Sequence, residues 1–352
     1  MIDRHLRSLT ELGLRNVPGL GPVRDRVGMA VTNLLTDGAG RPEVVDSADI
    51  AYPGDPGLFG PDSVTWRVHS DLAMFVGGVR SLLVQSLHPL AMTGVARHSA
   101  FRDDPLGRLA RTGAYVGVTT FGAVPEAEQM IAAVRAVHER VRGVADDGRP
   151  YSANDPALLA WVHNVEVESF LVAYRRYGSA PLTDVDADRY VAEMTEVLRR
   201  FGVDDASLMP CTAGDLTRWI RTHPEQARIP ETTEAVRFLM LPPLPVTALP
   251  SYGVIAAAAV GLVPVRQRRL LGLAAPVPFS SSGSRHGVLG DVERVVAGGV
   301  DRAAATSASV FDAVVVRPAV QSLMGVMGWA LGSESPALAA ANRRVAAGDY
   351  RP

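Results

Sequence analysis

Residues 155–178 read DPALLAWVHNVEVESFLVAYRRYG, and this stretch decides the fold class. Asp155 is a residue type that caps helix N-termini, and Pro156 suits the first helical position. Gly178 follows the apolar pattern and is typical of a helix C-terminus. The stretch therefore predicts one long helix that carries a histidine, His163, among mostly apolar neighbours.

His163 lies near the middle of the apolar face of this predicted helix. The residues that share an arc of about 80° with it are Leu159, Val167, Phe170 and Tyr174. Glu166 lies on the same face, one turn further on. A buried imidazole and a buried carboxyl group both need compensating partners. Either both groups find hydrogen-bond partners in the core, or His163 binds a metal or a haem iron.

A second predicted helix, residues 106–122, carries polar side chains on one face. Those within an arc of about 60° are Arg108, Thr112, Tyr115 and Thr119. Arg111 is adjacent to Tyr115 on the helix surface. A solvated surface accounts for such a face, but arginine and hydroxyl groups also suit an anionic or oxygen-bearing ligand.

The composition excludes several classes of function. All 35 basic residues are arginine, so lysine Schiff-base chemistry and a P-loop lysine are absent. The single cysteine, Cys211, cannot form an intramolecular disulfide or a multi-thiolate metal site. The net charge of −2 gives no indication of nucleic-acid binding.

Helical periodicity continues through nearly the whole chain, which predicts an all-α fold. We expect an N-terminal helical extension over residues 1–60, a main domain over 61–275, and a linker with a C-terminal helical tail over 276–352. Residues 64–88 are expected to form one helix. The N-terminus has no signal-peptide pattern, and the apolar run 252–265 is shorter than the ~20 residues that cross a bilayer. These features favour a cytoplasmic protein, with peripheral membrane contact and a homodimer left open.

Three separated motifs occur in order along the chain: GGVRSLLVQSLHPLAMTGVARHSAFRDDPLGRLARTGAYVGVTTFG from Gly77, YSANDPALLAWVHNVEVESFLVAY from Tyr151, and LPPLPVTALPSYGVIAAAAVGLVPVRQRRLLGL from Leu241. They resemble the MpaB-type oxygenase family, which includes the latex-clearing rubber oxygenases. The resemblance covers roughly residues 63–273. It implies a globin-like helical bundle around haem b. His163 is then the proximal iron ligand, and Arg108 and Thr112 lie over the haem.

The sequence departs from the rubber oxygenases at two positions of the implied site. Arg111 stands where those enzymes have a lysine that can occupy the distal iron position, and a protonated arginine is not an ordinary iron ligand. Between Arg67 and Pro125 there is also no glutamate to match their presumed base. The proton-transfer groups that remain there are Asp103, Asp104, His88 and His98.

The first hypothesis is a haem-b-dependent oxygenase or oxidase that uses O2 or peroxide on an apolar small molecule. The catalytic candidates are Arg108, Arg111, Thr112 and His98. The cofactor-binding candidates are His163, Arg108, Thr112, Tyr115 and Glu166, with His163 binding the iron. The alternatives are a haem-binding or sensing protein without turnover, and a helical relative that binds no cofactor.

Overall fold

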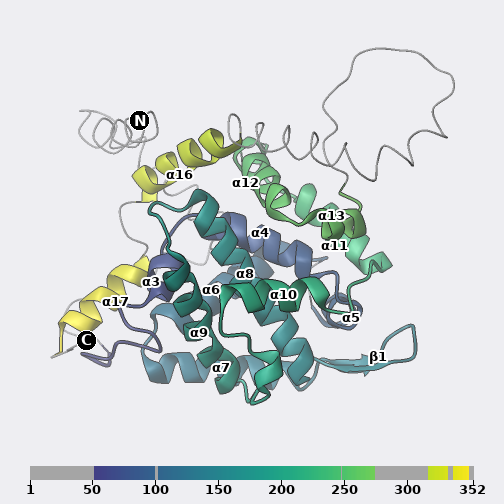
Figure 1. The fold of residues 1–352 in the computed structure, drawn as a ribbon, viewed down its shortest axis with the longest axis horizontal. Helices are drawn as coiled ribbons and strands as arrows, with labels where there is room; N and C mark the ends of the chain where they lie inside the picture. The colour runs from purple at the N-terminus through teal and green to yellow at the C-terminus, as the bar shows by residue number, and fades with distance from the viewer. Residues whose placement is uncertain (1–50, 100–101, 247, 274–315, 332–335, 349–352) are drawn as a thin grey trace, which may run out of the picture.

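A helical body accounts for almost all of the structure (Figure 1). The computed structural model describes residues 51–99, 102–246, 248–273, 316–331 and 336–348. Within these residues the only sheet has two strands, which confirms the predicted all-α fold. The globin-like arrangement around a haem stays a prediction. Most of the predicted N-terminal extension, and the linker that opens residues 276–352, lie outside the described residues.

The central element is α8 (Pro156–Tyr177), which lies in the middle of the body in Figure 1. Its main partner is α4 (Met74–Gln85). The two helices approach closely at Gly77, where an added Cβ would lie 2.7 Å from the Phe170 ring. Trp161 is buried in the same interface and donates a hydrogen bond from Nε1 to the Gln85 carbonyl, at 3.1 Å. The contacts with α4 therefore determine the rotation of α8 about its axis, and with it which side chains of α8 point toward the other helices.

The single helix expected over residues 64–88 is wrong, because the chain breaks after α3 (Val64–His69) and resumes in α4. Asp71 accounts for the break. Its carboxylate accepts hydrogen bonds from the backbone N–H groups of Ala73 and Ser179, each at 2.8 Å. The second bond comes from a residue distant in sequence, so helical periodicity carries no sign of it.

Shorter helices surround α8. They are α5 (Pro89–His98), α6 (Pro105–Phe121), α7 (Val124–His138), α9 (Asp184–Arg200) and α10 (Ala213–Thr222). A single 3-10 turn, η2 (Ala206–Leu208), precedes α10. Helix α9 packs on α3 and α8, whereas α6 packs chiefly on α7. Several helices therefore contact α8 or one another around it.

A small antiparallel hairpin, β1 (Arg142–Val144) and β2 (Pro150–Ser152), follows α7. The helical periodicity of the sequence does not predict this hairpin. The turn sequence Asp147-Gly148 is a hairpin signal, and Gly148 adopts a φ of 85° that favours glycine.

Five further helices complete the described structure. They are α11 (Pro230–Met240), α12 (Leu249–Leu262), α13 (Val265–Leu271), α16 (Arg317–Leu331) and α17 (Pro336–Ala346). Helix α12 packs on α4, and α16 packs on α12 with Val320 fully buried. Helix α17 packs on α6. In the described part of the chain, no helix combines the length and the apolar character needed to cross a membrane.

Candidate functional site

His163 lies in α8, as expected, and the predicted cap starts that helix. The Asp155 carboxylate accepts hydrogen bonds from the backbone N–H groups of Ala157 and Leu158, at 2.9 and 3.2 Å. Asn164 and Val165, which follow His163, are buried, whereas His163 has intermediate exposure. The imidazole is therefore available to a ligand, although α8 is packed on several sides by other helices.

The backbone of α9 orients the His163 ring. Burial lowers the pKa of His163 to about 4, and a hydrogen bond to the backbone carbonyl of Met194 opposes this effect. The imidazole is therefore neutral at pH 7, with one ring nitrogen donating to Met194. The other nitrogen has no partner among the described residues. A neutral imidazole held in this way is the usual state of a histidine that ligates a metal.

Glu166, one turn beyond His163, is the second unusual group. Its carboxyl group has no hydrogen bond or ion pair within the described residues, and burial raises its pKa to about 7. Its charge also acts on two tyrosines of other helices, Tyr115 of α6 and Tyr190 of α9. The pKa of each is raised, first by burial and then by Glu166. Polar groups from three helices therefore lie near one another in the interior.

His69, at the end of α3, links these helices by hydrogen bonds. Its Nδ1 lies 2.7 Å from Thr120 Oγ1, and its Nε2 lies 2.9 Å from the Tyr190 hydroxyl. Its ring also makes an edge contact with Phe170. Burial, and then the nearby His163, lowers the pKa of His69 to about 3. His69 is not among the predicted site residues, although a polar residue inside an apolar run is a signal that the sequence carries.

The polar face predicted on α6 is half-buried rather than fully wetted. Arg108, Thr112 and Tyr115 all have intermediate exposure. Arg108 donates a hydrogen bond from Nη1 to Ser99 Oγ at 2.6 Å, and burial, followed by Arg111, lowers its pKa. The Thr112 hydroxyl donates to the Arg108 carbonyl at 3.0 Å. These residues therefore form a partly enclosed surface of hydrogen-bonding groups.

Two predicted site residues lie apart from this group. Arg111 is exposed and pairs with Asp104, with 3.1 Å between Nη1 and Oδ2. Asp104 also accepts a hydrogen bond from the Gly107 N–H, so the pair belongs to the N-terminus of α6. His98 is exposed, and its Nε2 lies 2.9 Å from the hydroxyl of Tyr151 in β2. The structure gives neither residue a contact with His163.

A buried ion pair on another side of α8 also escapes the sequence analysis. Arg80 of α4 contacts Glu168, with 2.8 Å between Nη2 and Oε2, and both side chains are almost fully buried. Arg80 also donates to Ser169 Oγ and to the Leu262 carbonyl. Glu168 is therefore part of the α4–α8–α12 interface, in contrast to the unpaired Glu166 two residues earlier.

Among the described residues, no three histidine, cysteine, aspartate or glutamate side chains are grouped so as to hold a metal ion. His163 is thus a single imidazole donor. Haem iron needs only one protein imidazole, because the macrocycle supplies its other nitrogen ligands. The donor set of the described residues fits haem on this ground.

Residues 66–290 match the family described as ER-bound oxygenase mpaB/B'/Rubber oxygenase, catalytic domain. The chain belongs to this family. The match includes His163, Glu166 and the polar face of α6, and it leaves α16 and α17 outside. No curated protein and no solved structure matches the chain. Membership supports a general oxygenase function for this chain.

Proposed function

We propose that this oxygenase-family member is a haem-b-dependent oxidoreductase that acts on an apolar small molecule. The observation that carries the proposal is the state of His163, which is neutral, partly accessible and bonded through one nitrogen to Met194. His163 would hold the iron, and the Met194 carbonyl would keep the imidazole in one orientation. When bound, the haem would supply the chemistry of O2 or peroxide activation.

Arg108 and Thr112 are the residues that we propose to bind oxygen-bearing groups of the cofactor or substrate. The guanidinium of Arg108 stays protonated at neutral pH and is only partly hydrated. A hydrogen bond from a half-buried cation is stronger than one from a solvated cation. Arg111 and His98 are left out of this role, because their contacts are with Asp104 and Tyr151.

Glu166 is the group that we propose to hold or release a proton at its carboxyl oxygens. Its pKa of about 7 leaves the protonated and ionised forms comparably populated at neutral pH. No glutamate lies between Arg67 and Pro125, where the rubber oxygenases have their presumed base, so we propose that Glu166 of α8 takes this role. Apolar side chains on the His163 face, including Val167 and Phe170, favour an apolar substrate.

Absorbance spectroscopy of the purified protein supplemented with haem tests the cofactor. We expect a Soret band in the wild type and its loss or shift in His163→Gln, which keeps a donor toward Met194 but removes the imidazole. His98→Gln is the matched control and leaves the spectrum unchanged. Circular dichroism checks that each variant folds. A wild type without a Soret band, or His163→Gln with the wild-type spectrum, contradicts the proposal.

A haem-binding protein without turnover is the second candidate. The observation that favours it is the ion pair of Arg111 with Asp104, which holds the residue at the lysine position on the surface. This candidate predicts a bound haem but no oxygen consumption with isoprenoid or phenolic substrates. Oxygen-electrode measurements on the haem-loaded protein distinguish the two functions.

A further inference from the structure

Helix α12 presents an exposed face without polar side chains. Leu249, Gly253, Ala257 and Gly261 follow one another at four-residue spacing, and all four are exposed. A Cβ added at Gly253 or Gly261 would meet no atom of the described residues within 4 Å, so none of them covers this face there. The opposite face packs into the core through residues such as Ile255 and Ala259. The open face extends over the length of α12, about 21 Å.

Exposed aliphatic side chains lie at both ends of this face. Leu241 and Val246, in the loop before α12, are 75% and 81% exposed, and Leu249 is 40% exposed. Val265, which begins α13 at the other end, is 50% exposed. Exposed apolar residues that gather in this way usually mark a site of interaction.

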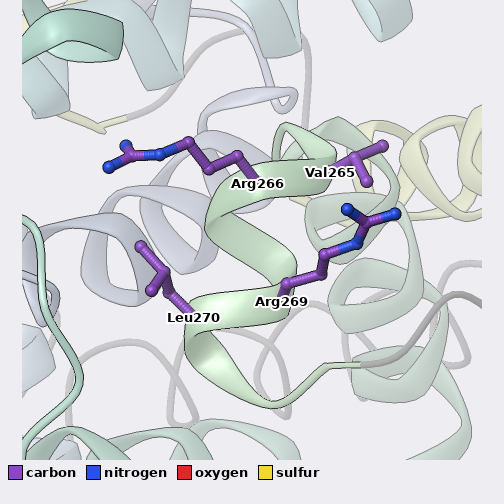
Figure 2. A pocket seen from close by; sticks show the side chains of 4 residues that line it. All are labelled: Val265, Arg266, Arg269 and Leu270. Atoms are coloured by element: carbon purple, nitrogen blue, oxygen red, sulfur yellow. The ribbon is translucent and has the colours of Figure 1, made fainter. Parts of the chain in front are cut away.

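An open hollow of about 580 Å³ lies at α13, lined by Val265, Arg266, Arg269 and Leu270. Figure 2 shows Arg266 and Leu270 on one side of the helix, and Arg269 and Val265 on the other. Each side therefore combines a guanidinium group with an aliphatic side chain one turn away. This combination suits a ligand that has an anionic head next to an apolar chain.

The charged residues of α13 are all arginines, and α12 has no charged residue. Residues 235–290 contain no aspartate or glutamate, and α13 carries Arg266, Arg268 and Arg269. In the described part of the chain, neither Arg266 nor Arg269 has a carboxylate partner. The guanidinium of Arg228 lies against Gly272 at the end of α13 and donates to Thr233. Four arginines therefore gather beside the apolar face.

We propose that α12 and α13 form a docking surface for an anionic phospholipid membrane, with Arg266 and Arg269 binding the headgroup phosphates. The apolar face would lie in the interfacial layer, as in other peripheral helices. Charge complementarity selects this occupant. A second copy of the same surface would bring the arginines of one α13 against those of the other, which is unfavourable.

Sedimentation with vesicles tests the proposal on the full-length protein, with or without haem. Vesicles of equal parts phosphatidylcholine and phosphatidylglycerol are expected to bind it, and vesicles of phosphatidylcholine alone to bind it much less. Binding weakens at high salt, because salt screens the attraction between arginines and lipid phosphates. Each arginine near an anionic surface contributes about fivefold to partitioning, so Arg266→Gln/Arg269→Gln loses roughly 30-fold.

The matched control is Arg140→Gln/Arg142→Gln, which removes two exposed arginines near β1 and is expected to keep wild-type binding. Leu249→Ser/Val265→Ser tests the apolar part and is expected to weaken binding to anionic vesicles. All of these positions are exposed, so the variants should melt as the wild type does.

Three outcomes overturn the proposal. The first is equal binding to both kinds of vesicle. The second is absence of vesicle binding, whether because inorganic phosphate alone occupies the arginines or because another part of the chain covers the surface. The third is a concentration-dependent dimer, lost in Leu249→Ser/Val265→Ser, in place of vesicle binding. None of these results bears on the haem spectrum, so this proposal and the proposed function fail separately.

Discussion

The ring of His163 on α8 donates a hydrogen bond to the backbone carbonyl of Met194 on α9. A main-chain acceptor is fixed by helix packing rather than by a side-chain rotamer. The orientation of the imidazole therefore depends on how α8 and α9 pack, and the same contact leaves the second ring nitrogen free. The hydrogen bonds of His69 to Thr120 and Tyr190 hold α3, α6 and α9 around this position.

Acid should destabilise the protein through His69. Its pKa is about 3 in the folded chain and 6.5 ordinarily, so below pH 6.5 only the unfolded chain takes up this proton. The free energy of unfolding should therefore fall as the pH falls from about 6.5 toward 3, by up to about 1.4 kcal/mol per pH unit for this one group. Urea unfolding of His69→Gln should show a shallower pH dependence than the wild type.

His98→Gln is the control for this measurement. His98 is exposed, and its hydrogen bond is to Tyr151 of the hairpin, so this variant controls for the loss of a histidine outside the core around His163. The pKa values of His163 and His88 are also lowered to about 4, so these two histidines still contribute to the pH dependence of stability in His69→Gln. Equal slopes for His69→Gln and the wild type contradict the assignment of a buried neutral imidazole.

Glu166→Gln and Glu168→Gln, two substitutions on α8, should change the stability of the protein in opposite directions. The pKa of Glu166 is raised to about 7 from its ordinary 4.5, so its contribution to stability is complete below pH 4.5 and is lost as the pH rises through 7. At alkaline pH, Glu166→Gln should be more stable than the wild type, by at most roughly 3 kcal/mol. Glu168→Gln leaves Arg80 without its partner and should lose roughly 3–5 kcal/mol.

Chemical unfolding of the haem-free variants at acidic and alkaline pH measures both effects. The advantage of Glu166→Gln should disappear in acid, where the wild-type carboxyl group is protonated as well. A destabilised Glu166→Gln at alkaline pH would mean that the carboxylate has a partner in solution, and it would remove the basis for its proton-transfer role.

Local sequence signals predict the position of α8 and the character of the α6 face. Asp155 and Pro156 start α8 where the capping rule puts them, and Arg108, Thr112 and Tyr115 share one partly enclosed surface. These features depend on neighbours within a few residues in the chain. Helical periodicity is sufficient to identify them.

The remaining parts of the site depend on contacts between distant residues. The partners of His69 lie 51 and 121 residues away, and those of Arg80 lie 88 to 182 residues away. The break between α3 and α4 likewise depends on the bond from Ser179 to Asp71. The exposed position of Arg111 is also not predictable from periodicity. It depends on the direction of the Arg111 and Asp104 side chains at the N-terminus of α6, where the two form an ion pair.

Two adjacent glycines of α4 should differ in their tolerance of alanine. At Gly77 an added Cβ would lie 2.7 Å from the Phe170 ring and 3.0 Å from the Ser169 carbonyl, whereas at Gly78 nothing lies within 4 Å. Gly77→Ala should therefore lose about 1–3 kcal/mol by overpacking the α4–α8 interface. Gly78→Ala should gain up to about 1 kcal/mol from helix propensity.

Thermal melts of the two variants provide the comparison, and each is the control for the other. Because Phe170 lies on the same face of α8 as His163, the proposed iron ligand, Gly77→Ala should also disturb haem binding, whereas Gly78→Ala should not. Equal stability of the two variants contradicts a tight contact between α4 and α8.

Arg344 should matter to stability far more than Arg343, its neighbour on α17. Arg344 is buried and donates hydrogen bonds to the carbonyls of Asp55 and Phe121, at 2.9 and 2.8 Å, whereas Arg343 is exposed. Arg344→Ala leaves two carbonyls without a donor and opens a gap beside Phe121, so it should lose about 2–4 kcal/mol. Arg343→Ala should stay within about 0.5 kcal/mol of the wild type. Urea unfolding monitored by circular dichroism measures both, and equal midpoints would show that α17, which lies outside the family match, does not stabilise the catalytic domain.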